Sequence, residues 1–351
     1  MGGMMDYQRW PEDETKELQR LRDFGFTIKE IADKLGRSPG SVYNKLKNEG
    51  IVYNFPCTHR RGIQSTKKRE FPDVEKLLKL TIEANELIRQ FDPRERETLV
   101  EYLTSKWIGI PFISDFHFDH YKTDLKTLVK EIEEIGAEED VFVIHNGDTG
   151  DYSDTRFSGL NIPSFYLPLD LRLKLAFYLI SKIKNLLVIV DGCHDDWVKN
   201  RKFDIIRAIV DKHNELGLPT IYFGYGGFLN FKVGRQLYRF AIYHKYPGES
   251  QYNIFHPCLK IIQQLDATAD IVCVSHRHDK MGISYQYIQH KPRVLIRTGS
   301  HQYLTDYAWK QGFGGAVARS PMVLLNGTEK RMLAFPHYKE GMEELRRLNR
   351  E

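Results

Sequence analysis

The stretch IGIPFISDFH, residues 108–117, decides the fold of most of this chain. Its apolar run has the length of a buried strand, and it ends in Asp115 and His117. Two similar stretches follow, VFVIHNGDTGD at 141–151 and LLVIVDGCHD at 186–195. Because helical patterns at 125–135 and 171–183 separate these runs, we predict strands joined by helices, with a sheet covered by helices.

Further apolar runs extend this sheet region. Strand-like runs lie at 228–233, 237–243, 271–274, 283–287 and 294–296, with helical patterns at 205–215 and 254–265. The later strands lack long crossovers, so we expect mixed or antiparallel pairing among them. The predicted fold class is therefore α/β, a layered β-sheet core covered by helices, preceded by a small all-α domain.

Carboxylates and imidazoles recur at the ends of these strands. His244 follows one late strand, and His276 and His278 follow another. Strand ends are where open α/β sheets place their sites. In extended backbone, side chains two residues apart face the same side, so Asp115 and His117 are expected to point together. A single histidine is usually structural, but five polar clusters in order predict a site for divalent ions.

These five stretches resemble the motifs of the calcineurin-like metallophosphoesterase superfamily over residues 108–301. The motifs are Asp-x-His, Gly-Asp-x-x-Asp, Gly-Asn-His-Asp/Glu, a lone His and Gly-His-x-His. The resemblance implies a metallophosphoesterase fold with two metals, which together can clamp a phosphate and activate a water. It implies a first metal on Asp115, His117 and His278, a shared Asp148, and a second metal on His244 and His276. It also implies that His194 protonates the leaving oxygen, with Asp195 orienting it.

Three positions depart from the family pattern. Cys193 stands where the family has a ligand Asn, Ser275 replaces a Gly, and Tyr243 stands where many members have Gly. A Cys193 thiolate would bind the second metal and favour a softer ion such as Zn or Fe, whereas the alternative is a small cysteine with no ligand role. The remaining positions are kept, so we expect an active centre. Its mixed oxygen and nitrogen ligands predict Mn, with Zn, Fe or Ni as alternatives.

Residues 6–52 carry a second pattern, of three short helices at about 12–24, 28–35 and 39–48. Gly36 suits the end of the second helix, and Ser38-Pro39 suits the start of the third. We expect Val42, Tyr43 and Leu46 to face inward, which leaves Ser41, Asn44 and Lys45 outside. The stretch resembles Myb/SANT-like and bacterial helix-turn-helix modules, through Trp10, Glu12-Asp13-Glu14, Ile31-Ala32, Leu35-Gly36-Arg37-Ser38 and Ser41-Val42. That implies DNA binding, the alternative being a protein-interaction module.

The distribution of charge supports the same interpretation. Residues 1–70 hold 14 of the 51 basic and 10 of the 47 acidic residues, so the whole net charge of +4 lies there. The segment 53–72 reads as a basic linker, which either contacts phosphates or is a solvated loop. The predicted DNA-binding residues are Arg37, Ser41, Asn44 and Lys45 in the helical module and Arg60, Arg61, Lys67, Lys68 and Arg69 in the linker.

The predicted organisation has five parts. These are a helix-turn-helix domain (6–52), the basic linker (53–72), a helical connector (73–105), a metallophosphoesterase domain (106–335) and a charged, exposed C-terminal helix (336–351). No apolar run is long enough for a membrane span, the N-terminus lacks signal-peptide features, and the four cysteines form no Cys-x-x-Cys pair. We therefore expect a cytoplasmic protein without a membrane partner. The sequence does not indicate an oligomeric state.

Together these features predict a two-metal phosphoesterase that hydrolyses phosphodiester bonds. DNA is the expected partner and substrate, which makes the chain a nuclease, in the most concrete version one that nicks. Such a fusion is reminiscent of phage-encoded enzymes. The alternatives are a phosphatase or small phosphodiester hydrolase with a regulatory N-terminal module, and a non-catalytic DNA-binding scaffold.

Overall fold

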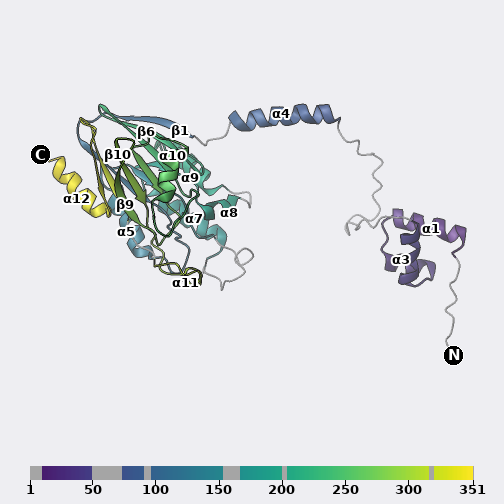
Figure 1. The fold of residues 1–351 in the computed structure, drawn as a ribbon. Helices are drawn as coiled ribbons and strands as arrows, with labels where there is room; N and C mark the ends of the chain where they lie inside the picture. The colour runs from purple at the N-terminus through teal and green to yellow at the C-terminus, as the bar shows by residue number, and fades with distance from the viewer. Residues whose placement is uncertain are drawn as a thin grey trace. The chain divides into compact units, whose positions relative to one another are not determined.

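The computed structural model describes residues 10–49, 73–90, 96–152, 167–199, 204–315 and 320–350. The chain divides into two compact units, Met1–Leu87 and Ile88–Glu351, which are described separately (Figure 1). The predicted basic linker, 53–72, lies outside the described residues.

The first unit contains three short helices around a small core. They are α1 (Glu12–Asp23), α2 (Ile28–Leu35) and α3 (Pro39–Asn48). Thr27 and Glu30 form a capping box that starts α2, Gly36 ends it with a φ of 61°, and Ser38 caps α3. The core consists of Leu18, Leu21, Ile31, Ala32, Val42 and Leu46. The three predicted helices are thus present, but the inward position predicted for Tyr43 is wrong, since this side chain is 47% exposed.

The predicted helical connector is only half correct. Residues Val74–Gln90 form helix α4 as expected, but Glu97–Tyr102 form strand β1, which pairs in parallel with β6 (Gly226–Val233). The burial of alternate residues is that of a strand and not of a helix. Thr98, Val100 and Tyr102 are partly buried, while their neighbours are exposed. Val100 and Tyr102 pack on the core between the sheets, so β1 belongs to the second compact unit and not to a linker.

Two six-stranded mixed sheets form the body of the second unit (Figure 1). The first has the order β1-β6-β7-β8-β10-β9, where the new strands are β7 (Gln236–Tyr243), β8 (Ile271–Val274), β9 (Gly282–Ile288) and β10 (Lys291–Arg297). The second has the order β12-β11-β2-β3-β4-β5, composed of β2 (Trp107–Ile113), β3 (Val143–His145), β4 (Leu186–Ile189), β5 (Ile221–Tyr222), β11 (Met322–Asn326) and β12 (Met332–Phe335). Strands β2 to β5 are parallel, whereas the first sheet is mixed, as predicted.

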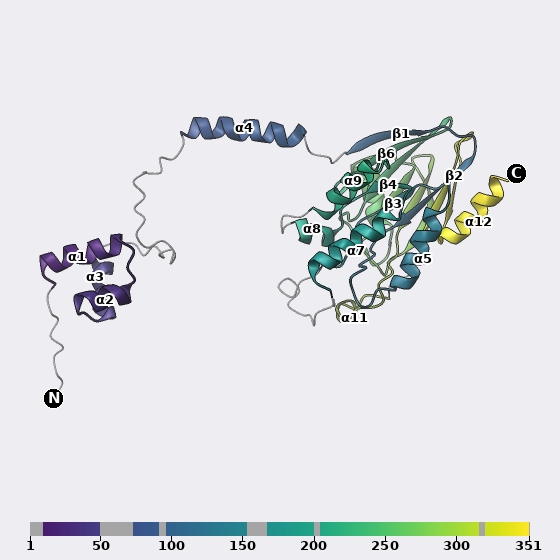
Figure 2. The ribbon, with the colours of Figure 1, turned by 180° about the vertical axis from the view of Figure 1, so that it is seen from behind.

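Buried side chains join the two sheets face to face. One core holds Ile110 and Phe112 of β2 together with Phe240 of β7 and Ile271 of β8. A second core lies between the outer face of the second sheet and helices α5 (Leu125–Gly136), α7 (Leu169–Ser181), α9 (Ile205–Glu215) and α12 (Tyr338–Leu348). Helix α10 (His256–Gln264) covers the first sheet in the same way (Figures 1 and 2). The arrangement is helix, sheet, sheet, helix, which confirms the predicted layered α/β fold.

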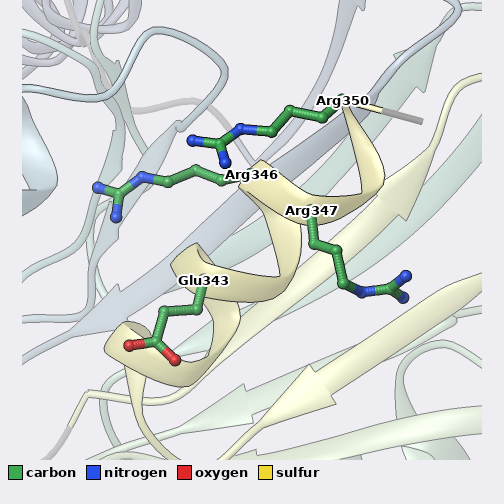
Figure 3. A pocket seen from close by; sticks show the side chains of 4 residues that line it. All are labelled: Glu343, Arg346, Arg347 and Arg350. Carbon is green, nitrogen blue, oxygen red and sulfur yellow. The ribbon is translucent and has the colours of Figure 1, made fainter.

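The C-terminal helix α12 is packed, and its predicted exposure is wrong. Met342 and Leu345 are 4% and 3% exposed and belong to the core beneath the second sheet. Its polar face carries Glu343, Arg346, Arg347 and Arg350, which line a shallow hollow on the surface (Figure 3). The predicted boundary at residue 336 is therefore not a domain boundary, because the helix that follows it packs on the same core. Among the helices that the structure describes, none combines the length and apolar character of a membrane span.

Candidate metal centre

Five loops that follow strands bring the predicted ligands together. Asp115 and His117 follow β2, Asp148 follows β3, and Cys193 opens the short helix α8 (Cys193–Lys199) just after β4. His244 follows β7, and His276 and His278 follow β8. Both sheets therefore contribute, and the ends of their strands meet at one place.

The backbone at this place is unusual. Asp115, His117, Asp148 and His276 have φ values of 50°, 43°, 55° and 73°, in the left-handed region that side chains other than glycine rarely adopt. The expected extended alternation at Asp115–His117 is therefore wrong, and the two side chains converge through a left-handed loop. Such backbone is held only where surrounding contacts over-determine it. Here the backbone N–H of Asp115 donates to the Gly147 carbonyl (2.9 Å), and Ser300 Oγ donates to the Asp115 carbonyl (2.7 Å).

Two glycines allow the loops after β3 and β4 to touch. A Cβ at Gly192 would lie 2.0 Å from both the amide nitrogen and the Oδ1 of Asp148. A Cβ at Gly147, where φ is 85°, would lie 2.8 Å from the Nδ1 of His244. The approach of Asp148 to its neighbours therefore requires glycine at both positions.

The donor atoms form two groups with Asp148 between them. Asp115, His117 and His278 form the first group, and Cys193, His244 and His276 form the second. In the first, His117 Nε2 lies 3.0 Å from His278 Nε2, which is 3.3 Å from Asp115 Oδ1. Asp148 Oδ2 lies 3.1 Å from His244 Nε2 and 3.9 Å from His117 Nε2, so one carboxylate faces both groups. The structure therefore brings the predicted donor side chains together, Cys193 among them.

The donor set fits divalent ions. Asp115 Oδ1, His117 Nδ1 and His244 Nε2 are buried and make no well-formed hydrogen bond among the described residues, although Asp148 Oδ2 lies 3.1 Å from His244 Nε2. Buried polar atoms are otherwise almost always hydrogen-bonded, so atoms of this kind are suited to a cation. Burial lowers the pKa of His117 to about 3 and that of His276 to about 4, which keeps both imidazoles neutral as metal ligands require. These buried clusters could hold metal ions.

His244 and Asp148 are linked by charge. Burial alone would lower the pKa of His244, but the facing Asp148 carboxylate raises it well above the usual value. Burial likewise opposes ionisation of Asp148, yet His244 and His194 bring the pKa of this carboxyl well below its usual range. A cation bound here would take the place of the proton on His244.

His194 is positioned by Asp151, not by Asp195. Its Nδ1 donates to the Asp151 carbonyl at 2.5 Å and lies 3.2 Å from the Asp151 carboxylate. The Trp197 ring lies against the imidazole at a tilt of 38°, with centroids 4.1 Å apart. Although partial burial favours the neutral ring, the charges of Asp148 and Asp151 raise the pKa of His194 to about 10. With Nδ1 engaged by Asp151, the second proton of the charged ring is on Nε2.

Asp195 has a different role from the predicted one. It is fully buried and accepts the backbone N–H groups of Asp148 and Gly192 at 2.9 Å and of Thr149 at 3.3 Å. It therefore joins the loops after β3 and β4. Burial and the charge of Asp148 raise the pKa of Asp195 to about 8, while the N–H donors act in the opposite direction.

The sequence did not reveal a buried ion pair behind Asp151. Asp119 accepts the Asp151 N–H at 2.5 Å and the Arg172 guanidinium of α7 at 2.9 Å. The side chains of Asp119 and Arg172 are 1% and 6% exposed. Asp119 therefore fixes the backbone that presents Asp151 to His194. The position of Asp119, two residues after His117, was the one sequence feature that could have indicated a role for it. No sequence feature indicated that the distant Arg172 would be its partner.

Other predicted residues lie away from this centre. Arg37 forms a bidentate ion pair with Glu14 (2.7 Å) and lies over the Trp10 ring, so it stabilises the three-helix unit. Lys45 pairs with Glu49 at 2.6 Å, Asn44 is exposed and Ser41 is partly exposed. The predicted linker residues Arg60, Arg61, Lys67, Lys68 and Arg69 lie outside the described part of the chain. The hollow on α12 contains none of the donor residues.

Comparisons with known proteins give limited similarity. No family model matches the chain, and no curated protein matches it. The crystal structure of Chaetomium thermophilum Vps29 is 12% identical with a TM-score of 0.35, and the match covers 65% of this chain and 96% of that one. Haemophilus influenzae NAD nucleotidase is 9% identical with a TM-score of 0.32, and the match covers 65% of this chain and 49% of that one. Pseudomonas putida nuclease MPE is 18% identical with a TM-score of 0.26, and the match covers 64% of this chain and 87% of that one. Since every TM-score is below 0.5, function must be argued from the geometry.

Proposed function

We propose that this protein is a two-metal phosphoesterase that hydrolyses phosphodiester bonds in DNA. The observation that carries the proposal is the pair of donor groups on either side of the buried Asp148 carboxylate. Asp115, His117 and His278 would hold one ion, Cys193, His244 and His276 the other, and Asp148 would contact both. Two divalent ions at such a site polarise a phosphoryl oxygen and supply an activated water.

His194 would act on the leaving group. Its Nδ1 is engaged by Asp151, so its Nε2 is the nitrogen available to substrate. Since the pKa of His194 is raised to about 10, the ring holds a proton there at neutral pH and can donate it to the departing oxygen. Trp197 and Asp151 would keep the ring in the orientation that this transfer needs.

The second group favours a softer ion than the first. Cys193 is a free cysteine whose sulfur lies within 4.8 Å of donor nitrogens of His244 and His276. Thiolate with two imidazoles suits Zn or Fe, whereas the first group, with one carboxylate and two imidazoles, also suits Mn. We therefore propose Mn, Zn, Fe or Ni as candidate ions, with the softer ones at the Cys193 position.

The three-helix unit would hold DNA. Two helices joined by a tight turn at Gly36, with Ser41, Asn44 and Lys45 on the third helix, match a helix-turn-helix plan. The basic residues 60–69 would add phosphate contacts. Arg37 is excluded from the proposed contacts because it is held by Glu14.

The test is cleavage of supercoiled plasmid by purified protein after addition of Mn or Zn. We expect nicking, and its loss by at least a hundredfold in Asp148→Ala, since that change removes the shared carboxylate. His256→Ala, at an exposed histidine that begins α10, is the matched control and should behave as wild type. If metal-loaded protein leaves DNA intact but hydrolyses a phosphomonoester, the chain is a phosphatase. If it binds DNA without any bound metal or hydrolysis, it is a DNA-binding scaffold.

A further inference from the structure

The exposed members of the metal centre mark its mouth. Asp115, His117, Asp148 and His244 are at most 2% exposed. The side chains of His194 and His278, by contrast, are 22% and 26% exposed. Cys193 and His276 are partly exposed as well, so the centre opens on the side of these four residues, and the segments beside His194 and His278 form part of its rim.

Two hydrogen-bonded segments, 118–124 and 302–313, lie along this rim. The first is tied to the centre, because Thr123 Oγ1 donates to the carbonyl of His117 at 2.6 Å. The second is tied to the first, because the backbone N–H of Tyr303 donates to the Lys122 carbonyl at 2.8 Å. At its other end Phe313 packs under the Arg277 guanidinium, 4.3 Å away, next to His278. The second segment thus extends from the loop of His117 to the loop of His278.

These segments carry three exposed aromatic rings. Tyr121, Tyr303 and Trp309, the last on helix α11 (Asp306–Lys310), are 51%, 60% and 73% exposed. We name them the aromatic rim. Tyr121 stacks on His120 with centroids 4.9 Å apart, and the Tyr303 hydroxyl donates to Asp124 at 2.9 Å. Single exposed aromatics are ordinary, but these three lie on two segments that are hydrogen-bonded to each other and to the loop of His117.

The rim adds little free positive charge. Lys122 pairs with Asp306 at 3.0 Å, and Arg277 pairs with Asp279 at 3.0 Å, which leaves the exposed Lys310 at the end of α11 as the free cation among the described residues of the two segments. A partner held here would therefore be bound through ring faces more than through charge. Nucleobases have such faces, and only an unpaired strand presents them, since the bases of a duplex are stacked on one another.

We propose that the aromatic rim binds an unpaired nucleic-acid strand, with bases stacked on Tyr121, Tyr303 and Trp309 and a backbone phosphate at the metal centre. This rests on the proposed phosphodiesterase function and specifies its substrate class. The three-helix unit would hold duplex, while the rim would receive the strand that is cut. Because two of the three cations nearby are paired, binding at the rim depends more weakly on salt than binding through several phosphate contacts.

The first experiment measures binding of fluorescent oligothymidine, which cannot form a duplex with itself, to the full-length protein in EDTA. We expect Trp309→Ala and Tyr303→Ala each to weaken binding about tenfold. Tyr287→Ala is the matched control, since this tyrosine is 83% exposed on β9 but pairs with Pro292 at the far end of the hairpin from His278. Unchanged affinity in both rim variants, or an equal loss in the control, overturns the proposal.

The second experiment compares hydrolysis of oligothymidine with hydrolysis of bis(p-nitrophenyl) phosphate. We expect the rim variants to lose about tenfold in kcat/KM on the oligonucleotide and nothing on the small diester. Equal losses on both substrates would show that the rim only supports the fold, and capture of a phosphopeptide in place of oligothymidine would also overturn the proposal. Rim-dependent binding with no hydrolysis of either substrate would instead refute the phosphoesterase function and leave the rim intact.

Discussion

At the scale of single residues, two aspartates near His194 separate the chemistry from the folding of the site. Asp151 contacts the imidazole, and Asp195 accepts three backbone N–H groups from the two glycine-bearing loops. The first sets where a proton is held, and the second sets where Asp148 lies. Substitution of each by asparagine, which preserves its size, should therefore have different effects.

We predict that Asp195→Asn lowers the free energy of unfolding by about 2 kcal/mol, because both carboxyl oxygens accept backbone N–H groups and the amide NH2 would face one of these donors. Asp151→Asn should change stability less, but should slow hydrolysis of esters with poor leaving groups more than esters with good ones, since only the former need the proton of His194. Urea unfolding and a series of substituted phenyl esters measure the two effects. Asp211→Asn, on the exposed side of α9, is the control, and identical profiles for both variants would contradict the assignment.

Cys193 leads to a second prediction at this scale. If its thiolate is a ligand, Cys193→Ala should reduce bound zinc from about two ions to about one per chain. Cys193→Asn should restore the second ion and shift the preference from Zn toward Mn, because an amide oxygen is a harder ligand. Elemental analysis after dialysis gives the stoichiometry. Two tightly bound zinc ions in the alanine variant would show that the sulfur is not a ligand.

At the scale of elements, the approach of the β3 and β4 loops depends on Gly192. We predict that Gly192→Ala abolishes metal binding at the second group, because the added Cβ would lie 2.0 Å from the amide nitrogen of Asp148. Gly315→Ala is the matched control, since no heavy atom lies within 4 Å of a Cβ placed there. Calorimetric titration with Zn measures the effect. A Gly192→Ala protein that binds two ions as tightly as wild type would refute it.

Apolar runs between helical segments were sufficient to predict most strands and the order of the site loops. Strand β1 was missed because Leu99 and Leu103 mimic a helical stripe, although Leu99 is 58% exposed and the alternate residues face the core. The partner of His194 was also missed. Asp195 is adjacent in sequence, but successive side chains on helix α8 point in different directions, so adjacency did not bring them together. The Asp119–Arg172 pair joins segments far apart in the chain, which no local pattern encodes.

At the scale of the whole molecule, the two units allow binding and hydrolysis to be separated. We predict that removal of residues 1–90, which ends before β1, leaves hydrolysis of bis(p-nitrophenyl) phosphate unchanged, because the donor residues and cores lie in the second unit. Binding of duplex DNA should fall and lose its dependence on salt. Steady-state kinetics and anisotropy at two salt concentrations check both effects. Duplex binding that survives the truncation would place the DNA contacts in the second unit.

The left-handed backbone at four ligand positions also has a consequence for the protein under selection. Glycine at Asp115, His117, Asp148 or His276 would remove roughly 1–2 kcal/mol of conformational strain at each position. Random mutagenesis screened only for heat resistance would therefore accept glycine at these sites and enrich for inactive descendants. Selection for a more stable protein therefore has to include the proposed activity in the same round, because stability and that activity favour different residues at these four positions.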